Sequence, residues 1–375
     1  MADAPLEYAL AEMAAGKIPS AAFDDWDAFD RRAEEHRLRP LLHHFHRDNA
    51  AIPQTIRELW ATAYRASAIT ALHQRRELLE IAELCTASGL HPVALKGAWL
   101  AWNAWPDPAL RPLRDLDLYL PDEGALRARE ILLEKGWHEN ESEGLDQLGG
   151  EEWLARFKAL PSLVSPGGVA VDLHVRLWDD DGRVPAPPDG LLERCIADAD
   201  HPCLRYLAPI DQLMHLAIHA TAHRFDGGPL MLADFGYLLA AEAFDWPAIR
   251  ARADREGWRS HLALCLAAAK RWSGIEVLWP EFPGAVPGNL LEALPLLLCK
   301  PLEAREGDIA AAKLARKDIG LGEKLRRIRA RRERHGSLRD YLGWVGSEVS
   351  AVARTSIRGS ERSVAIAAFD DWLKS

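Results

Sequence analysis

The chain lacks the features that mark exported, membrane-spanning or disulfide-built proteins. Among its 375 residues there are only five cysteines, an odd number with no C-x-x-C pair, which argues against a disulfide framework and against a zinc knuckle. No run approaches the roughly 18 consecutive apolar residues of a membrane span. The first residues also lack the basic and then apolar pattern of a secretory signal. We therefore expect a cytoplasmic protein without membrane association.

An excess of positive charge is also missing. The chain has 46 Lys and Arg against 56 Asp and Glu, a formal net charge of -10. Because proteins that bind the phosphate backbone concentrate positive charge, nucleic acid stays open as a partner but is disfavoured. The exception is the segment 313–339, with eleven basic and three acidic residues. It predicts a charged helix surface that either pairs with the acidic remainder or contacts an anionic acceptor.

Hydrophobic spacing divides the sequence into three parts. Helical spacing of three and four residues extends from about Phe23 to Gly89, and it returns from Pro209 onward. Between them, four short segments have strand-like patterns: HPVALKG, DLDLYL, and the two arms of an expected hairpin, RFKALPSLVS and VAVDLHVRL. Pro161 predicts an edge strand at best for the segment that contains it. We therefore expect an N-terminal helical region (1–89), a mixed α/β core (90–182) and a C-terminal helical domain (183–375).

Carboxylates gather on two of the expected strands. Strand side chains alternate, so Asp115 and Asp117 share one face, with Cα atoms roughly 6–7 Å apart. On a second strand Asp172, His174 and Arg176 likewise share the polar face. Three strand-borne carboxylates can hold divalent ions for phosphoryl or nucleotidyl transfer. The alternative is that D-x-D here is only the wet face of an amphipathic strand, and the pattern alone leaves both open.

Groups suited to phosphate lie on either side of these carboxylates. Lys96 and Gly97 end an apolar strand and begin a helix, where backbone N–H groups and a positive charge favour an anion. Arg111 and Arg114 stand in the loop before the carboxylates, and guanidinium groups bind phosphate oxygens in pairs. The alternative for both arginines is charge pairing with Asp107 or with the carboxylates themselves.

A row of histidines occupies one later helix. His215, His219 and His223 recur every four residues and so lie along one face. The row has the spacing of a metal site, but the glutamate of the H-E-x-x-H metalloprotease motif is missing. This argues against a zinc metalloprotease. We expect the row to face the sheet, where His219 or His223 contacts the acceptor or a structural carboxylate such as Asp234.

Fourteen tryptophans are many for this length. Trp99, Trp102 and Trp105 have the i, i+3, i+6 spacing of one helix face. We expect them to pack in the core. The alternative is that one of them stacks on a nucleobase or on a flat acceptor.

Several of these segments together resemble a known family. The segments LKGAWLAWNAWPDPALRPLRDLDLYLP, VDLHVRL, YLAPIDQLMHLAIHATAHRF and LADFGYLLA match, in order and spacing from about residue 25 to 275, the uncharacterised bacterial nucleotidyltransferase family. That family is similar to the DNA polymerase beta-type nucleotidyltransferase superfamily. By this resemblance Gly97 takes the glycine position, Asp115 and Asp117 bind the metals and Asp172 is the third carboxylate. Ala98 departs from the usual serine, and the interval from Gly97 to the carboxylates is longer than usual.

The resemblance implies a fold and a reaction. The fold is α+β, with a small mixed-sheet nucleotidyltransferase core between N-terminal helices and a C-terminal helical domain. With Mg²⁺ or Mn²⁺, the enzyme moves a nucleoside monophosphate from a nucleoside triphosphate such as ATP to a hydroxyl or phosphate acceptor, a small molecule or a peptide, and releases pyrophosphate. The implied binding residues for the donor are Lys96, Gly97, Arg111 and Arg114, and for the acceptor His174, Arg176, His219 and His223.

Two other functions stay open. One is a toxin-like nucleotidylation of a protein or a transfer RNA. The other is a non-catalytic nucleotide-binding protein, which the missing serine at Ala98 favours. The donor base, the acceptor and the oligomeric state are not predicted.

Overall fold

The computed structural model describes residues 4–20, 24–139, 153–154, 157–178, 184–282, 286–304 and 360–373. The basic segment 313–339 lies outside these ranges, so the expectation for it stays a prediction. None of the helices in the described ranges is long and apolar enough to cross a membrane.

The N-terminal helices follow the predicted spacing, with one addition. Helices α2 (Trp26–Glu35), α3 (Arg39–His46) and α4 (Gln54–Ala87) lie where the apolar spacing predicts them. Helix α2 starts at a side-chain cap, because the Asp25 carboxylate accepts a 2.8 Å hydrogen bond from the backbone N–H of Ala28. Helix α1 (Ala4–Ala14) was not predicted. Its alanine-rich sequence shows little difference in polarity between the faces of the helix, yet most of its later residues are buried.

A seven-stranded mixed sheet forms the middle of the chain, in the order β3-β4-β5-β2-β1-β7-β6. Its strands are β1 (Val93–Ala94), β2 (Leu116–Tyr119), β3 (His138–Glu139), β4 (Leu163–Val164), β5 (Ala170–His174), β6 (Ile196–Ala197) and β7 (Arg205–Tyr206). Strand β2 pairs antiparallel with β1 and parallel with β5, and β1 pairs parallel with β7. The predicted α+β class is confirmed. The domain boundaries at 89 and 182 stay predictions.

Strand β4 is not an edge strand, so that expectation is wrong. It pairs with β3 on one side and with β5 on the other. The strand begins at Leu163, two residues after Pro161, and the proline therefore stands outside the hydrogen-bonded ladder. The turn between β4 and β5 contains Gly168, whose φ of 81° lies in the left-handed region.

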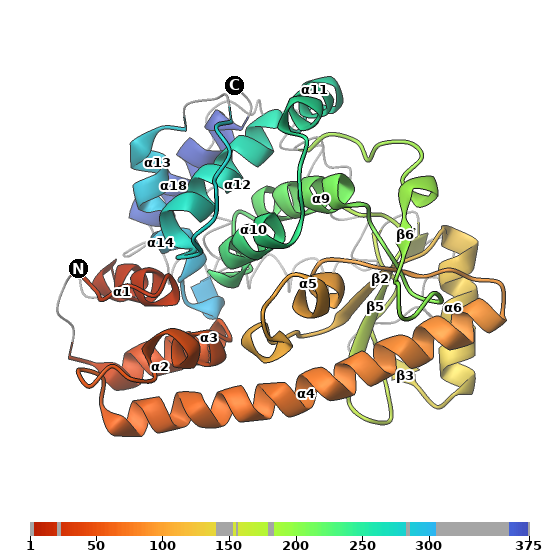
Figure 1. Ribbon diagram of the computed structural model, residues 1–375, viewed down its shortest axis with the longest axis horizontal. Coiled ribbons are helices and arrows are strands. Elements are labelled where there is room, and N and C mark those ends of the chain that lie inside the picture. The colour runs from red at the N-terminus through yellow and green to blue at the C-terminus, as the bar shows by residue number, and fades with distance from the viewer. Residues whose placement is uncertain are drawn as a thin grey trace, which may run out of the picture.

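Helices lie around the sheet and are the other regular elements of the described chain. Between the strands lie α5 (Gly97–Asn103), the short 3-10 helix η1 (Pro108–Leu110) and α6 (Asp122–Glu134), and later another 3-10 turn, η2 (Leu192–Arg194). The C-terminal helices are α9 (Pro209–Ala222), α10 (Leu230–Ala241), α11 (Trp246–Glu256), α12 (Arg259–Trp272), α13 (Gly288–Ala293), α14 (Pro295–Leu298), η3 (Leu302–Ala304) and α18 (Ser360–Trp372). Figure 1 shows α4 running from the N-terminal helices to the sheet.

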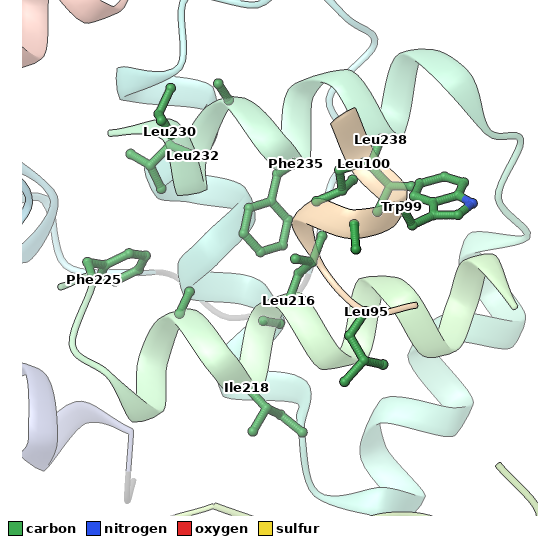
Figure 2. Packing of buried hydrophobic residues seen from close by; sticks show 14 of the residues in the cluster. Leu95, Trp99, Leu100, Leu216, Ile218, Phe225, Leu230, Leu232, Phe235 and Leu238 are labelled. Carbon is green, nitrogen blue, oxygen red and sulfur yellow. The ribbon is translucent and has the colours of Figure 1, made fainter. Parts of the chain in front are cut away.

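The core continues from the sheet into the C-terminal helices through α5. Figure 2 shows Leu95, just after β1, and Leu100 of α5 packed near Leu216 of α9 and Phe235 of α10. All four side chains are buried. Burial of large apolar side chains contributes about 1.5–3 kcal/mol each, which fixes α5 between the sheet and the helical domain.

The tryptophans of this region pack as expected. Trp99 and Trp105 are each 5% exposed and belong to the core. Trp102 is half-buried, and the Arg75 guanidinium carbon lies 5.5 Å from the centre of its ring. The core interpretation is therefore confirmed for Trp99 and Trp105.

Candidate active site

Neighbouring strands bring the predicted carboxylates together. In the parallel pairing of β2 with β5, Asp117 lies opposite Asp172, and Tyr119 lies opposite His174. The alternate residues Leu116 and Leu118 are fully buried on the other face. Because side chains alternate along a strand, this register places Asp117 and Asp172 side by side on one face of the sheet.

Asp117 is the most strongly held of the carboxylates. Its Oδ1 accepts a 2.8 Å hydrogen bond from Lys96 Nζ and a 2.6 Å hydrogen bond from His174 Nε2. Burial alone would raise the pKa of Asp117, but the Lys96 charge and the His174 hydrogen bond hold it well below its ordinary value. Both bonds end on Oδ1, so among the described residues nothing donates to Oδ2.

Asp115 has the opposite electrostatic character. Burial, followed by repulsion from Asp117 and Asp172, raises its pKa to about 6, although Lys96 and Arg37 act against the rise. Three carboxylates therefore lie close enough to repel one another even with a lysine among them. A divalent cation would relieve this repulsion.

One group of side chains in the described ranges has the spacing of a metal site. Asp117, Asp172 and His174 each offer one ligand atom, and these atoms lie within 4.8 Å of one another. Oxygen and imidazole nitrogen donors at this spacing suit a divalent ion. Asp115 is not in the group, and its coupling to the site is the repulsion just described.

Lys96 and Gly97 form the turn from β1 into α5. Lys96 has φ 45° and ψ -119°, a conformation that a residue with a side chain rarely adopts. Gly97 is required for close packing, because a Cβ atom there would lie 2.1 Å from Arg111 Nη1 and 2.5 Å from Leu113 Cδ2. This turn therefore places the ammonium group over Asp117 and seats the arginine loop against the start of α5.

Arg111 ties that loop to the C-terminal domain. Its Nε and Nη2 donate hydrogen bonds of 2.6 and 2.7 Å to the two carboxylate oxygens of Asp234 on α10. Trp105 Nε1 donates to the same carboxylate at 2.8 Å. Asp234 was expected to contact His219 or His223, and its partners are these two groups instead. Arg111 is thus engaged in an internal ion pair, and its contact with phosphate stays a prediction.

The remaining predicted donor and acceptor residues differ in their surroundings. Arg114 is exposed and immediately precedes Asp115 in sequence. Arg176 donates a 2.7 Å hydrogen bond from Nη2 to the backbone carbonyl of Phe157. Their contacts with substrates stay predictions.

The histidine row of α9 lies next to the polar face of the sheet. His215 is fully buried, and burial and the Lys96 charge lower its pKa well below the ordinary value. The same two causes lower the pKa of His219. The ring centres of His215 and His219 are 6.2 Å apart, and those of His219 and His223 are 4.6 Å apart. His215 and His219 are therefore neutral imidazoles at neutral pH.

His215 was not among the predicted site residues. Neither of its ring nitrogens has a hydrogen-bond partner among the described residues. Its spacing in the histidine row was visible in the sequence, but its contact with the sheet was not.

A metal-binding group on two sheet strands, with a lysine at an adjoining helix start, is an arrangement suited to metal-assisted phosphoryl chemistry. The chain belongs to the uncharacterised nucleotidyltransferase family, whose model matches residues 23–274. The match contains every site residue described above. No curated protein and no solved structure matches the chain. Family membership supports a transferase that uses a nucleoside triphosphate.

Proposed function

We propose that the protein is a metal-dependent nucleotidyltransferase that moves a nucleoside monophosphate from a nucleoside triphosphate to a hydroxyl or phosphate group of a small molecule or peptide. The observation that carries this proposal is the parallel register that places Asp117 beside Asp172. Lys96 donates a hydrogen bond to the Asp117 carboxylate. Asp117 and Asp172 would hold the ion, with Asp115 next to them. A bound Mg²⁺ or Mn²⁺ supplies charge neutralisation for the triphosphate.

The side chains of this chain account for the other parts of the transfer. Asp172 accepts the proton of the acceptor hydroxyl as its oxygen bonds to the α-phosphorus. The bond from that phosphorus to the bridging oxygen breaks, and pyrophosphate leaves with the electron pair. Lys96, whose ammonium group contacts Asp117, and the exposed Arg114, which precedes Asp115 in sequence, bind the phosphates of the donor in this proposal. In this proposal His219 and His223 contact the acceptor.

We also propose a relation to the DNA polymerase beta-type superfamily. The helix that starts at Gly97, the two acidic positions on β2 and the third on β5 follow the order of that superfamily's pattern. Ala98 is 1% exposed and replaces the usual serine, so no hydroxyl is available there. Lys96, two residues before it, supplies a cation for the triphosphate instead.

Calorimetric titration and a transfer assay test the proposal together. We expect at least one of ATP, GTP, CTP and UTP to bind in the presence of Mg²⁺ or Mn²⁺, and the α-labelled nucleotide to pass to an acceptor with release of pyrophosphate. Asp117→Asn and Asp172→Asn should lose transfer by about a hundredfold or more while remaining folded, because each removes a charge that the metal requires.

The matched control is Asp48→Asn. The Asp48 side chain is 93% exposed, and its ion-pair partner is Arg47, which is not a site residue. It should transfer like the wild type. Full transfer by Asp117→Asn would contradict the proposal. Binding without pyrophosphate release for every acceptor tried would indicate the non-catalytic function that Ala98 favours. A labelled protein or transfer RNA in a lysate would indicate the toxin-like alternative.

A further inference from the structure

The ligand atoms at the candidate metal site are not all oxygens. The third residue of the group is His174, whose side chain is 3% exposed and touches the first ligand, Asp117, at 2.6 Å. Mg²⁺ strongly prefers oxygen ligands, whereas imidazole nitrogen suits first-row transition ions. The composition of the group therefore bears on which ion it binds.

The His174 ring presents Nε2 to the carboxylates. This nitrogen lies 2.6 Å from Asp117 Oδ1 and carries the proton of that hydrogen bond, because a carboxylate oxygen only accepts. Binding of an ion at Nε2 requires the proton to move to the other nitrogen, Nδ1, which is buried and has no partner among the described residues. Nε2 is therefore the nitrogen of this ring that can share an ion with Asp117.

A second buried histidine independently points to a ligand at this place. His215 on α9 is 0% exposed, and neither of its nitrogens has a partner among the described residues. It lies within electrostatic reach of Lys96, Asp117 and His174, with the Trp178 ring 6.1 Å from its own. A further buried imidazole without a hydrogen-bond partner among the described residues therefore lies near this group, on α9.

We infer that this site is built for a first-row transition ion such as Mn²⁺ rather than for Mg²⁺, with His174 as its nitrogen ligand and Asp117 and Asp172 as its oxygen ligands. The inference rests on the proposed function only for the role of the ion. It concerns which ion the residues select, and selection can be measured without nucleotide or acceptor.

Electron paramagnetic resonance of Mn²⁺ bound to the full chain, without an affinity tag, tests the nitrogen ligand. We expect electron spin-echo modulation from a coordinated ¹⁴N that changes to ¹⁵N when the protein contains ¹⁵N-histidine. The signal should be lost in His174→Gln. It should persist in the control His138→Gln, because His138 is exposed on β3. A bound Mn²⁺ with no nitrogen modulation in the wild type would overturn the inference.

Selectivity gives a second measurement that does not require a loss of binding. Competition titration of Mn²⁺ against Mg²⁺ should show a clear preference for Mn²⁺ in the wild type. His174→Asp replaces nitrogen by oxygen and should reduce that preference at least tenfold, the scale that even an outer-shell partner contributes. Circular dichroism should show the variant folded. An unchanged preference in a folded His174→Asp variant would overturn the inference.

These outcomes separate this inference from the proposed function. Nitrogen-coordinated Mn²⁺ in a protein that binds no nucleotide would leave the inference standing and remove the function. Nucleotide transfer with an all-oxygen site and equal use of Mg²⁺ would do the reverse.

Discussion

Lys96 contacts a carboxylate of the candidate metal site and is also a proposed phosphate-binding residue. Its ammonium group lies 2.8 Å from Asp117 Oδ1, and the two side chains are only 12% and 13% exposed. An ion that binds Asp117 must share that carboxylate with a cation already present. A triphosphate offers the ammonium group another anion, so nucleotide binding should make the carboxylate more available to the ion.

Replacing this lysine should therefore separate the two affinities. In Lys96→Met we expect Mn²⁺ to bind more tightly without nucleotide, by roughly fivefold or more, and the nucleotide to bind more weakly. Calorimetric titration of each ligand measures both changes. Lys135→Met is the control, because Lys135 is exposed at the end of α6. Unchanged Mn²⁺ affinity in Lys96→Met would contradict this role.

A buried histidine outside the site should make stability depend on pH. Burial lowers the pKa of His261 to about 4, and its Nδ1 lies 2.7 Å from Thr221 Oγ1. An unfolded histidine has a pKa of about 6.5. Between these values the unfolded chain binds a proton that the folded chain does not, so acidification favours unfolding. Above about pH 6.5 both states are neutral and the contribution is fully present.

Urea unfolding at a series of pH values measures this effect. We expect the free energy of unfolding to fall as the pH decreases from 6.5 to 4, with His261 contributing on the order of 3 kcal/mol. His261→Gln should reduce the slope in that range. His91→Gln should retain it, because His91 is exposed. Equal slopes in the wild type and His261→Gln would show that His261 titrates normally in the folded protein.

At the scale of single elements, the start of α5 depends on a residue without a side chain. Arg111 cannot easily yield to a Cβ atom at position 97, because its Nε and Nη2 are bound to Asp234. Gly97→Ala should therefore displace the loop and destabilise the fold by about 1–3 kcal/mol. Thermal and urea unfolding measure the change, and nucleotide titration should show weaker binding.

Gly124 in α6 provides a matched comparison. A Cβ atom there would have its nearest neighbours at 3.7 Å, an ordinary contact. Gly124→Ala should leave stability unchanged or increase it by up to about 1 kcal/mol, since alanine favours the helix. If Gly97→Ala is as stable as Gly124→Ala, the close approach of Arg111 does not constrain position 97.

The sequence predicted elements that contain enough residues to show a period. Alternation over several residues located β2 and β5 and placed Asp117 and Asp172 on their polar sides. Strands of two residues, such as β3, β6 and β7, show no alternation and were not predicted. Helix α1 was missed because its alanines give little contrast between faces.

Contacts between residues that are distant in sequence could not be predicted from the sequence, for a different reason. The partner of Asp234 is Arg111, 123 positions earlier, and no local spacing connects the two. His215 likewise lies within electrostatic reach of Asp117 and His174, which come from two strands that are distant from it in sequence. Periodicity identifies which face of an element is polar, but the element that meets this face depends on the packing of the whole chain.

At the scale of the whole molecule, the sheet order brings together strands that are distant in sequence. Strand β1 lies between β2 and β7 in the sheet. These two neighbours of β1 are far apart in sequence, because strands β3 to β6 lie between them along the chain. The Arg111 ion pair with Asp234 then joins the loop before β2 to α10. The site thus depends on the contact between the sheet and the C-terminal helices as well as on its own strands.

A second long-range ion pair fixes the last described helix. Arg224, just after α9, donates from Nε and Nη2 to the two oxygens of Asp370 on α18 at 3.0 and 2.9 Å. The rings of Phe225 and Phe369 lie beside this pair, with centres 5.7 Å apart. In Figure 1, α18 lies against α13 and α14, which it contacts. The end of the chain is thereby held to the helix that carries the histidine row.

Breaking this pair should loosen α18 before the rest of the protein. Asp370→Asn leaves the buried Arg224 charge without its counter-ion and should cost about 3 kcal/mol. Hydrogen exchange should show faster exchange of α18 amides, and urea unfolding should show the lower stability. Asp371→Asn, at the exposed neighbouring position, should change neither. Equal exchange of α18 in the two variants would mean that apolar packing alone holds the helix in place, and the Arg224 pair would then contribute no more than a surface ion pair does.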